Sequence, residues 1–554
     1  MPQRREVAKF IERKRLKKTL YLCNIERINK KLSVFVPLWH EKIKNMKNKI
    51  IITLFIFCIS LTVSAQKIFD IKKYGAVGDG KTLNTKAIQK AIDAANKSKG
   101  GRVIFSKGTF LSGSIVLKNK VELFFEDGAI LLGSTNPDDY PKFEGIRALI
   151  LAYESKNIAV NGKGIINGQG RELALAIDSL HHSGIRIDPK YNYRRMRPED
   201  GRGKLISFVK CDSITMKHIT LKNSPGWVQC FRECKNIVID FMKVESRAYW
   251  NNDGIDVDGC ENVRITNCNV NAADDGICLK SEEPGLHNNN IYIGNCTIRS
   301  SANAVKFGTG SYGSFKNVTI ENIKVFDTFR SAIAIESVDG AEIENIKVSD
   351  ITAVNTGNAI LIRLGHRNGD KAGYIKNVSV KNVKAQIPFG RPDIDYDMRG
   401  PEVDYFHNPF PSSIAGIPGH LIENVTLENI EIVYPGRASK GMAYHPLSRL
   451  KDVNENIKGY PEFTMFGELP SWGFYVRHVN GIEMKNIKLV LDKEDFRPAF
   501  VFDDVKNLSM NAIDIPSDKI NQIIFKDVSS SNLDSESLKR KIEPEQNKFE
   551  LPAH

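Results

Sequence analysis

The chain has 554 residues, a length that fits either one large repeat domain or several smaller domains. Its net charge is +14, but residues 1–45 carry 13 Lys and Arg against 4 Asp and Glu, and two more lysines lie within residues 46–65. The rest of the chain therefore carries a net charge of only +3, which argues against nucleic acid as a partner.

Residues 46–65 have the pattern of a secretory signal peptide. Two lysines precede an apolar run over residues 50–63, and the small residue Ala65 ends the segment. The run is too short to favour a transmembrane helix, so we expect no stable membrane span in the mature chain. Because residues 1–45 precede the signal, we interpret them as a spurious or disordered extension; a membrane anchor with a basic cytoplasmic segment is the alternative. We expect export to the periplasm, the cell surface or the medium.

Residues 81–98, KTLNTKAIQKAIDAANKS, predict an amphipathic helix near the start of the mature chain. Its apolar residues recur at helical spacing: Ala87, Ile88, Ala91, Ile92 and Ala95. We expect this helix to cap the N-terminal end of the strands that follow, because the edge of a strand stack needs protection.

An internal repeat organises the chain from residue 66 to residue 529. Starting at Ile237, the equivalent apolar residues are Val263, Ile291, Val318 and Ile346, at steps of 26, 28, 27 and 28 residues. Each repeat opens with a polar residue, usually Asn, and continues with apolar residues at every second position, the pattern of strands with one buried face. Such a period, without the two-residue loops of hairpins, predicts an all-β fold, a single-stranded right-handed parallel β-helix.

Counting along the repeat assigns residues to inward-facing columns. One column holds Ile255, Ile277, Val305, Ile333 and Ile360, and a second holds Val257, Leu279, Phe307, Ile335 and Ile362. Residues 386–420 and 435–475 interrupt the repeat with Pro, Gly and aromatic residues, so we expect long loops there. Residues 530–554 are polar and charged and predict a flexible tail.

Seven cysteines follow Ala65, an odd number for an exported chain. Cys268 and Cys296 occupy equivalent places in the repeat and are expected to be small core residues. A disulfide between another pair, such as Cys230 and Cys234, stays open as an alternative.

Acidic residues recur one repeat apart in the phrases DGIDVDG, from Asp253, and DGICLKS, from Asp275. The register of the repeat places Asp253 over Asp275, with Asp274 beside it. Such crowded carboxyls cannot all ionise easily, so at least one should have a raised pKa. A protonated carboxyl beside a carboxylate suits the hydrolysis of a glycosidic bond. A single Asp-Gly is an ordinary turn sequence, and we expect Asp256 and Asp258 to be solvated or to cap turns.

The motifs Asn251-Asn252-Asp253-Gly254 and Asp274-Asp275 resemble the Asn-Thr-Asp and Asp-Asp motifs of glycoside hydrolase family 28, the polygalacturonases and rhamnogalacturonan hydrolases. The phrases FDIKKYGAVGDGKTLNTKAIQKAIDAA and GGRVIFSKGTFLSGSI also resemble this family. The resemblance implies a parallel β-helix and metal-independent hydrolysis with inversion. It further implies that Asp274 is the general acid and that Asp253 and Asp275 activate the attacking water. No metal site and no cofactor are expected.

The chain also departs from the family pattern at two places. Ala302-Asn303-Ala304 stands where polygalacturonases have Gly-His-Gly, and Ala334-Ile335-Glu336 stands where they have Arg-Ile-Lys, which holds the substrate carboxylate. We expect Lys306 to replace the missing cation, with Lys280 and Arg363 nearby; solvated side chains on an outer strand face are the alternative.

Further candidate substrate-binding residues are polar or aromatic and lie near the acidic motifs or in the long loops: Asn251, Asn303, His366, Trp472, Tyr475 and Arg477. Aromatic rings stack on sugars and arginine forks fit carboxylates. Alternatively, Trp472 only holds its loop against the body of the protein.

The sequence thus predicts a monomeric exported hydrolase that cleaves α-galacturonosidic linkages in pectin, either polygalacturonan or rhamnogalacturonan. Long loops around the site favour a pocket closed at one end and therefore exo action. One alternative is a calcium-dependent polysaccharide lyase on the same fold, because clustered carboxylates suit calcium. Another is a non-catalytic carbohydrate-binding β-helix.

Overall fold

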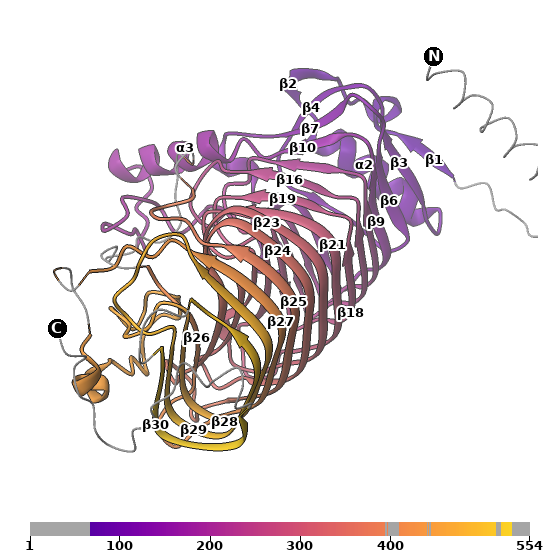
Figure 1. The fold of residues 1–554 in the computed structure, drawn as a ribbon. Coiled ribbons are helices and arrows are strands. Elements are labelled where there is room, and N and C mark those ends of the chain that lie inside the picture. Colours follow the sequence, from indigo (N-terminus) through magenta and orange to yellow (C-terminus); the bar gives the residue numbers. More distant parts are fainter. Residues whose placement is uncertain are drawn as a thin grey trace, which may run out of the picture. The chain divides into compact units, whose positions relative to one another are not determined.

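The strands of a computed structural model of the chain pair in parallel as successive coils (Figure 1). The structure describes residues 67–393, 396, 409–439, 441, 445–516 and 522–533. The expectations for residues 1–65 and for the tail beyond residue 533 lie outside the described residues. The last strand ends at Leu533, four residues after the boundary expected at residue 529.

The elements fall into many short strands and a few helices. The helices are η1 (Ile71–Tyr74), α2 (Thr85–Lys97), η2 (Pro137–Asp139), α3 (Gly170–His182) and η3 (Leu447–Asp452). The strands of the N-terminal coils are β1 (Ile68–Asp70), β2 (Asp79–Leu83), β3 (Gly101–Phe105), β4 (Gly108–Ser112), β5 (Ile115–Val116), β6 (Val121–Phe125), β7 (Ala129–Gly133), β8 (Ala148–Tyr153), β9 (Lys156–Gly162) and β10 (Ile165–Asn167). Those of the central coils are β11 (Lys204–Val209), β12 (Asp212–Lys217), β13 (Thr220–Lys222), β14 (Gln229–Arg232), β15 (Lys235–Asp240), β16 (Lys243–Ser246), β17 (Ile255–Asp258), β18 (Glu261–Thr266), β19 (Asn269–Ala272), β20 (Ile277–Ser281), β21 (His287–Ser300) and β22 (Val305–Ser311). The C-terminal coils contain β23 (Ser314–Ser337), β24 (Glu342–Leu364), β25 (Tyr374–Gln386), β26 (Ser412–Ala415), β27 (Ile422–Tyr434), β28 (Phe474–Leu491), β29 (Phe500–Asp514) and β30 (Ile523–Leu533).

Each strand pairs with the equivalent strand one coil away, which is the predicted parallel β-helix. β17 pairs in parallel with β14 before it and β20 after it. Both predicted inward columns are confirmed: Ile255 pairs with Ile277 and Val257 with Leu279, and the columns continue through β22, β23 and β24. The column residues are buried, so burial of alternate apolar side chains drives the stacking.

The recurring Asn of the repeat has a left-handed backbone at single positions within the long strands. Asn290, Asn317, Asn345 and Asn377 have φ between 55° and 59°, a region that Asn tolerates better than most residues. Their side-chain amides bond from coil to coil, for example from Asn345 to Asn317 and from Asn377 to Asn345, both at 3.2 Å. This conformational requirement explains why the repeat is recognisable in the sequence.

The helix expected over residues 81–98 is α2, which begins four residues later, at Thr85. Residues 79–83 instead form the strand β2, which pairs with β4. Within it, the Asp79 carboxylate accepts hydrogen bonds from the backbone N–H of Lys81 and Thr82. The buried face of α2, which includes Ile88 and Ile92, packs on η1, β1 and β3. That α2 protects the strand edge stays a prediction.

All seven cysteines after Ala65 are buried and free. Cys268 and Cys296 are core residues, as expected, and Cys230 and Cys234 form no disulfide.

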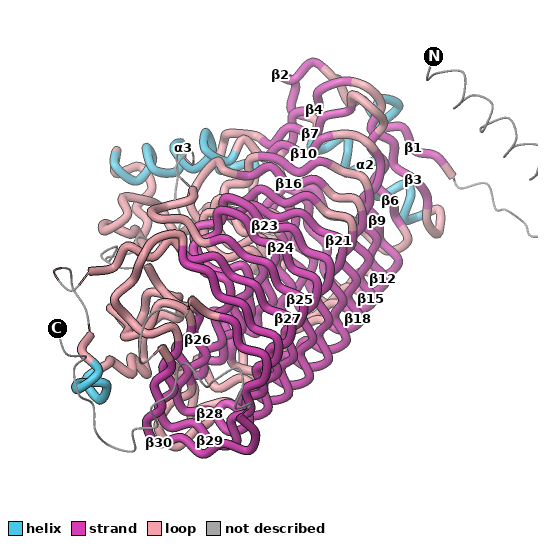
Figure 2. The backbone as a smooth tube through the Cα atoms, in the orientation of Figure 1, coloured by secondary structure: helices cyan, strands magenta, loops and turns pink. Residues whose placement is uncertain are grey.

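The loops gather along one side of the coils, around α3 and β26 (Figure 2). The segment 386–420, expected as a loop, contains the short strand β26, which pairs with β24 and β28. No helix in the described part of the chain has the length and apolar character needed to cross a membrane.

Val348 and Val354 lie in the same strand, β24, but Val348 is 1% exposed and Val354 is 51% exposed. We expect Val348→Ala to lower the free energy of unfolding by about 2 kcal/mol, because it removes buried methyl groups and leaves a cavity. The matched control Val354→Ala should change it by less than about 0.5 kcal/mol. Urea-induced unfolding followed by circular dichroism measures both values. Equal effects of the two substitutions would contradict the inward orientation of the Val348 side chain.

Candidate active site

A cavity of about 700 Å³ opens where the acidic motifs enter their strands. Its lining from the coils includes Trp227, Trp250, Asn251, Asp253, Asp274, Asp275, Lys280 and Lys306. Two loops complete the lining, one with Arg194, Arg195 and Met196 between α3 and β11, and the other with Tyr460 and Glu462 between η3 and β28. The three predicted catalytic aspartates therefore lie in one cavity.

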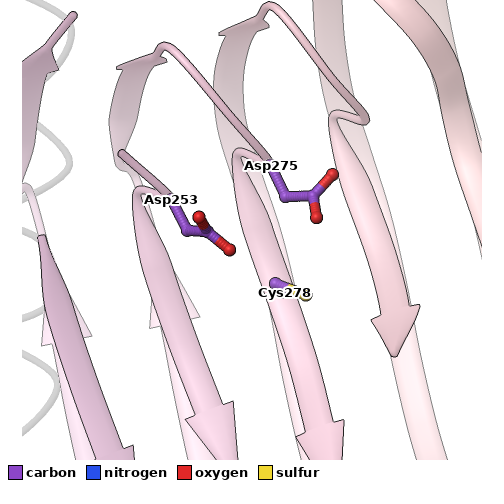
Figure 3. A group of neighbouring side chains, drawn as sticks. All are labelled: Asp253, Asp275 and Cys278. Atoms are coloured by element: carbon purple, nitrogen blue, oxygen red, sulfur yellow. The ribbon is translucent and has the colours of Figure 1, made fainter. Parts of the chain in front are cut away.

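Coil stacking brings Asp253 and Asp275 together, as the repeat register predicts (Figure 3). The backbone N–H of Gly254 donates to the carbonyl of Asp275 at 2.9 Å, and carboxylate oxygens of Asp253 and Asp275 lie within 4.8 Å of each other. Glycine is required after each aspartate: a Cβ on Gly254 would lie 2.5 Å from the carbonyl oxygen of Gly276. In the recurring Asp-Gly, the aspartate supplies the carboxyl group and the glycine allows the close approach of two coils.

Two buried lysines stabilise the stacked carboxylates. The Lys280 Nζ lies 3.1 Å from Oδ2 of Asp253 and 3.4 Å from Oδ1 of Asp256. The Lys306 Nζ lies 3.2 Å from Oδ2 of Asp275 and donates to the Tyr460 hydroxyl at 3.1 Å. Each lysine thus holds one of the two stacked aspartates with a short ion pair.

The same environment separates the pKa values of the three aspartates. Burial, together with the negative charges of Asp253 and Asp275, raises the pKa of Asp274 to about 7. Burial also raises the pKa of Asp253, although Lys280 opposes it. Burial acts on Asp275 in the same direction, but Lys306 and Lys280 outweigh it and lower the pKa of Asp275. The cavity therefore holds a protonated carboxyl next to a carboxylate near neutral pH.

Asn303 supports Asp275 from the next coil. Its backbone N–H and its Nδ2 donate to Oδ1 of Asp275 at 3.0 and 2.9 Å, and its own Oδ1 accepts from the N–H of Ser331. Asn303 is fully buried and does not line the cavity, so it orients Asp275 and is not placed to bind substrate as predicted. Asn251 does line the cavity, and its Oδ1 accepts from Arg202.

Five predicted substrate-binding residues lie outside the cavity: Arg363, His366, Trp472, Tyr475 and Arg477. Trp472 and Tyr475 are 1% and 0% exposed and belong to the apolar core, so neither is placed to stack on a sugar in the cavity. His366 contacts the carbonyl of Gly369 in its own loop.

The two arginines of this group anchor the loop that carries Tyr460. Arg363 donates to the carbonyls of Gly416 and Glu455, at 3.0 and 2.6 Å. Arg477 donates to the carbonyl of Val453 at 3.0 Å and pairs with the Glu455 carboxylate at 2.6 Å. They bind backbone and carboxylate of the protein itself, which corrects their assignment to the substrate.

Asp256 and Asp258 were expected to be solvated or to cap turns, and both are buried in β17, so they are not solvated. Asp256 faces Lys280, as described above. Asp258 accepts from the N–H of Glu282 at 3.1 Å and lies 3.6 Å from the guanidinium of Arg232.

Several lining residues were not predicted from the sequence, among them Arg194, Arg195, Trp227, Trp250 and Tyr460. For the tryptophans a signal was present, since each lies two to five residues before the strand that follows the same turn, β14 for Trp227 and β17 for Trp250. The other three lie in non-repeating segments, where the period assigns no position.

One group at the cavity wall has the composition of a metal site: Asp253 and Asp275, which line the cavity, and Cys278, which is buried behind them (Figure 3). Its donors do not fit calcium, which takes six to eight oxygen ligands. Lysine ammonium groups already pair with both carboxylates, and the Cys278 thiol donates to the carbonyl of Gly308 at 2.8 Å. The site is built for internal ion pairs and not for a cation.

Comparison with known proteins supports the fold and the family. Residues 102–389 match the family described as Glycosyl hydrolases family 28, and residues 68–135 match the family described as Rhamnogalacturonase A/epimerase, pectate lyase-like. A solved structure of a hyperthermoactive exopolygalacturonase from Thermotoga maritima superposes with a TM-score of 0.53 at 22% identity, covering 66% of this chain and 87% of the other. This likeness supports the parallel β-helix fold.

Two curated relatives are similar over most of the β-helix. The chain is 26% identical over 332 residues to a probable polygalacturonase of Vitis vinifera, covering 56% of this chain and 59% of that protein. It is 28% identical over 451 residues to an exo-poly-alpha-D-galacturonosidase of Dickeya chrysanthemi, covering 67% and 72%. The match thus spans less than two thirds of the grape protein. Because the family match covers more than half of this chain, the chain belongs to glycosyl hydrolases family 28.

Proposed function

We propose that the chain hydrolyses α-linked galacturonic acid in pectin, in polygalacturonan or in rhamnogalacturonan. The observation that carries this proposal is the stacking of Asp253 and Asp275 beside Asp274 in a single cavity, where the pKa of Asp274 is raised and that of Asp275 is lowered. Hydrolysis of a glycosidic bond requires this pair of states, an acid and a carboxylate. The family and the names of the two curated relatives support the substrate class.

In the proposed mechanism, Asp274 gives its proton to the leaving glycosidic oxygen as the bond to the anomeric carbon breaks. Asp253 and Asp275 hold the attacking water and take its proton, so that one displacement inverts the anomeric configuration. Lys306 keeps Asp275 ionised, and Asn303 fixes the orientation of this carboxylate. Trp227 and Trp250 are half-buried in the cavity wall and offer ring faces to the sugar.

We further propose that the enzyme is exported and removes sugars from chain ends. The segments around Arg195 and Tyr460 add walls to the coil surface, and a walled pocket accepts a chain end more easily than the middle of a polymer. The name of the Dickeya chrysanthemi relative, an exo-poly-alpha-D-galacturonosidase, agrees with exo action. The signal-like pattern of residues 46–65 and the polymeric substrate support export.

Product analysis tests the reaction class. The chain from Gln66 is incubated with polygalacturonan and with rhamnogalacturonan, each with and without chelator, and products are separated by chromatography and identified by mass spectrometry. We expect saturated galacturonic acid as the main early product, unaffected by chelator, because no step needs a metal. Unsaturated products lost on chelation would replace the proposal by a calcium-dependent lyase. Saturated oligomers as the main early products would support hydrolysis but contradict exo action.

Replacement of the proposed acid tests its role. Asp274→Asn cannot donate a proton, and we expect kcat to fall by about 100-fold or more. Asp370→Asn, a matched change at an exposed aspartate outside the cavity, should leave kcat unchanged. Steady-state kinetics on oligogalacturonides measure both, and thermal melting checks the fold. Wild-type turnover in a folded Asp274→Asn variant would contradict the assignment.

The pH profile tests the pKa values. The active form has Asp274 protonated, so kcat/KM should fall as pH rises through about 7, where this proton is lost. Because the pKa of Asp275 is lowered, its carboxylate persists in acid. The pKa of Asp253 is raised by burial, so the decline at low pH should reflect protonation of Asp253 and should begin above the ordinary range of Asp, about 4. The residual activity of Asp274→Asn should lack the alkaline decline. An identical alkaline decline in this variant would assign it to another group.

A further inference from the structure

Most cations around the cavity are neutralised by acidic residues of the protein. Lys280 pairs with Asp253 and Asp256, and Lys306 pairs with Asp275 and lies 3.9 Å from Glu336. Their positive charges are therefore already used within the site. Lys306, predicted from sequence to replace the missing substrate-binding cation, is 1% exposed. Its ammonium group pairs with carboxylates of the protein and not with substrate.

Arg194 and Arg195 are different. Both line the cavity, and neither forms an ion pair with any residue in the described ranges. Arg194 is exposed, and Arg195 is partly exposed, with its guanidinium 5.7 Å from the centre of the Trp250 ring. The cavity thus contains two guanidinium groups that form no ion pair within the part of the protein that the structure describes.

The segment that carries these arginines is held by its other arginines. Arg197 and Arg202 both pair with Glu199, at 2.9 and 3.0 Å. Arg202 also donates to the carbonyl of Trp250 at 2.9 Å and to Oδ1 of Asn251 at 3.2 Å. Because Trp250 and Asn251 directly precede the catalytic turn, the segment is attached to the turn that carries Asp253.

Arg195 lines the same cavity as the proposed acid, Asp274. Burial and the neighbouring charge of Arg197 lower the pKa of Arg195, while the negative charge of Asp274 acts in the opposite direction. An anion bound to Arg195 would therefore be next to the scissile bond that Asp274 protonates.

We propose that Arg194 and Arg195 form an anion-binding subsite that takes the carboxylate of a uronic acid next to Asp274. This inference rests on the proposed function and specifies which residues recognise the acidic sugar. A guanidinium fork suits a carboxylate and is worth more in a partly dry cavity than in water. The chain has Ala334-Ile335-Glu336 where related polygalacturonases carry cations, so the charge reaches the cavity from a different segment.

The subsite implies discrimination between free and methyl-esterified uronic acids. An ester accepts weaker hydrogen bonds and carries no charge, so it leaves the two guanidinium groups without their partner. The enzyme should therefore prefer de-esterified chains, and the arginines should be the source of this preference.

The test measures binding and turnover in the same variants. Arg194→Gln/Arg195→Gln removes both charges, and Lys190→Gln removes one exposed charge from the same segment outside the cavity. Affinities for trigalacturonate and for its methyl ester are measured by calorimetry in the Asp274→Asn background, where we expect cleavage to be slowed by about 100-fold or more. We expect the double substitution to weaken trigalacturonate binding by roughly 10- to 100-fold, with little effect on the ester. Lys190→Gln should leave both affinities unchanged.

Each outcome has one meaning. Unchanged preference for the acid over the ester in a folded double variant, shown by thermal melting, would overturn the subsite while leaving galacturonan hydrolysis intact. A shift of the pH profile alone, with unchanged binding, would also overturn it, because the arginines would then act on Asp274 and not on substrate. If the wild-type chain does not cleave galacturonan, the same titrations with galacturonate and glucuronate decide separately: arginine-dependent binding of either anion retains the subsite, and no such binding removes it.

Discussion

Parallel stacking of one coil on the next forces Asp253 and Asp275 together, and this unfavourable contact requires positive charge. Carboxylates held at this distance repel each other strongly once water is excluded. Lys280 and Lys306 supply the compensation from the same strands that carry the aspartates. The lysines do not neutralise all three acids equally, so one carboxylate remains charged while Asp274 keeps its proton. The register of the fold thus produces both the repulsion between the carboxylates and the difference between the pKa values of Asp274 and Asp275.

The outer face of these strands is unusual because it is both charged and buried. Asp256, Lys280, Lys306, Glu336 and Arg363 are all less than 10% exposed. The loops on this side cover them and in turn depend on them, since Arg363 and Arg477 hold the segment that carries Tyr460. Burying charge is costly unless it is paired. The charges of the coils therefore serve two purposes, which are to set the state of the acids and to fasten the walls of the cavity.

The sequence predicted those parts of the structure that the repeat determines. The inward columns and the stacking of Asp253 on Asp275 follow from a periodic pattern, because each coil must align its apolar residues with the next. It did not predict α3 or the positions of Arg195 and Tyr460, since these lie in segments without a period. Arg363 and Arg477 were assigned to substrate because residue type alone cannot tell a sugar carboxylate from a protein carbonyl. Trp250 directly precedes the motif that contains Asp253, so its position near the site could be predicted from the repeat, unlike those of Arg195 and Tyr460.

The path of the chain around the cavity also sets the order in which the site is completed. The aspartates and lysines lie between residues 253 and 306, whereas Tyr460, the hydroxyl partner of Lys306, lies more than 150 residues later. Its loop is held only once β24 and β28 are in place, because Arg363 and Arg477 are its anchors. A ribosome-bound chain that has emerged only as far as β23 would contain the full acid cluster with one wall absent. The wall that carries Tyr460 is therefore the last part of the cavity lining to be synthesised, after all the coils that carry the aspartates and lysines.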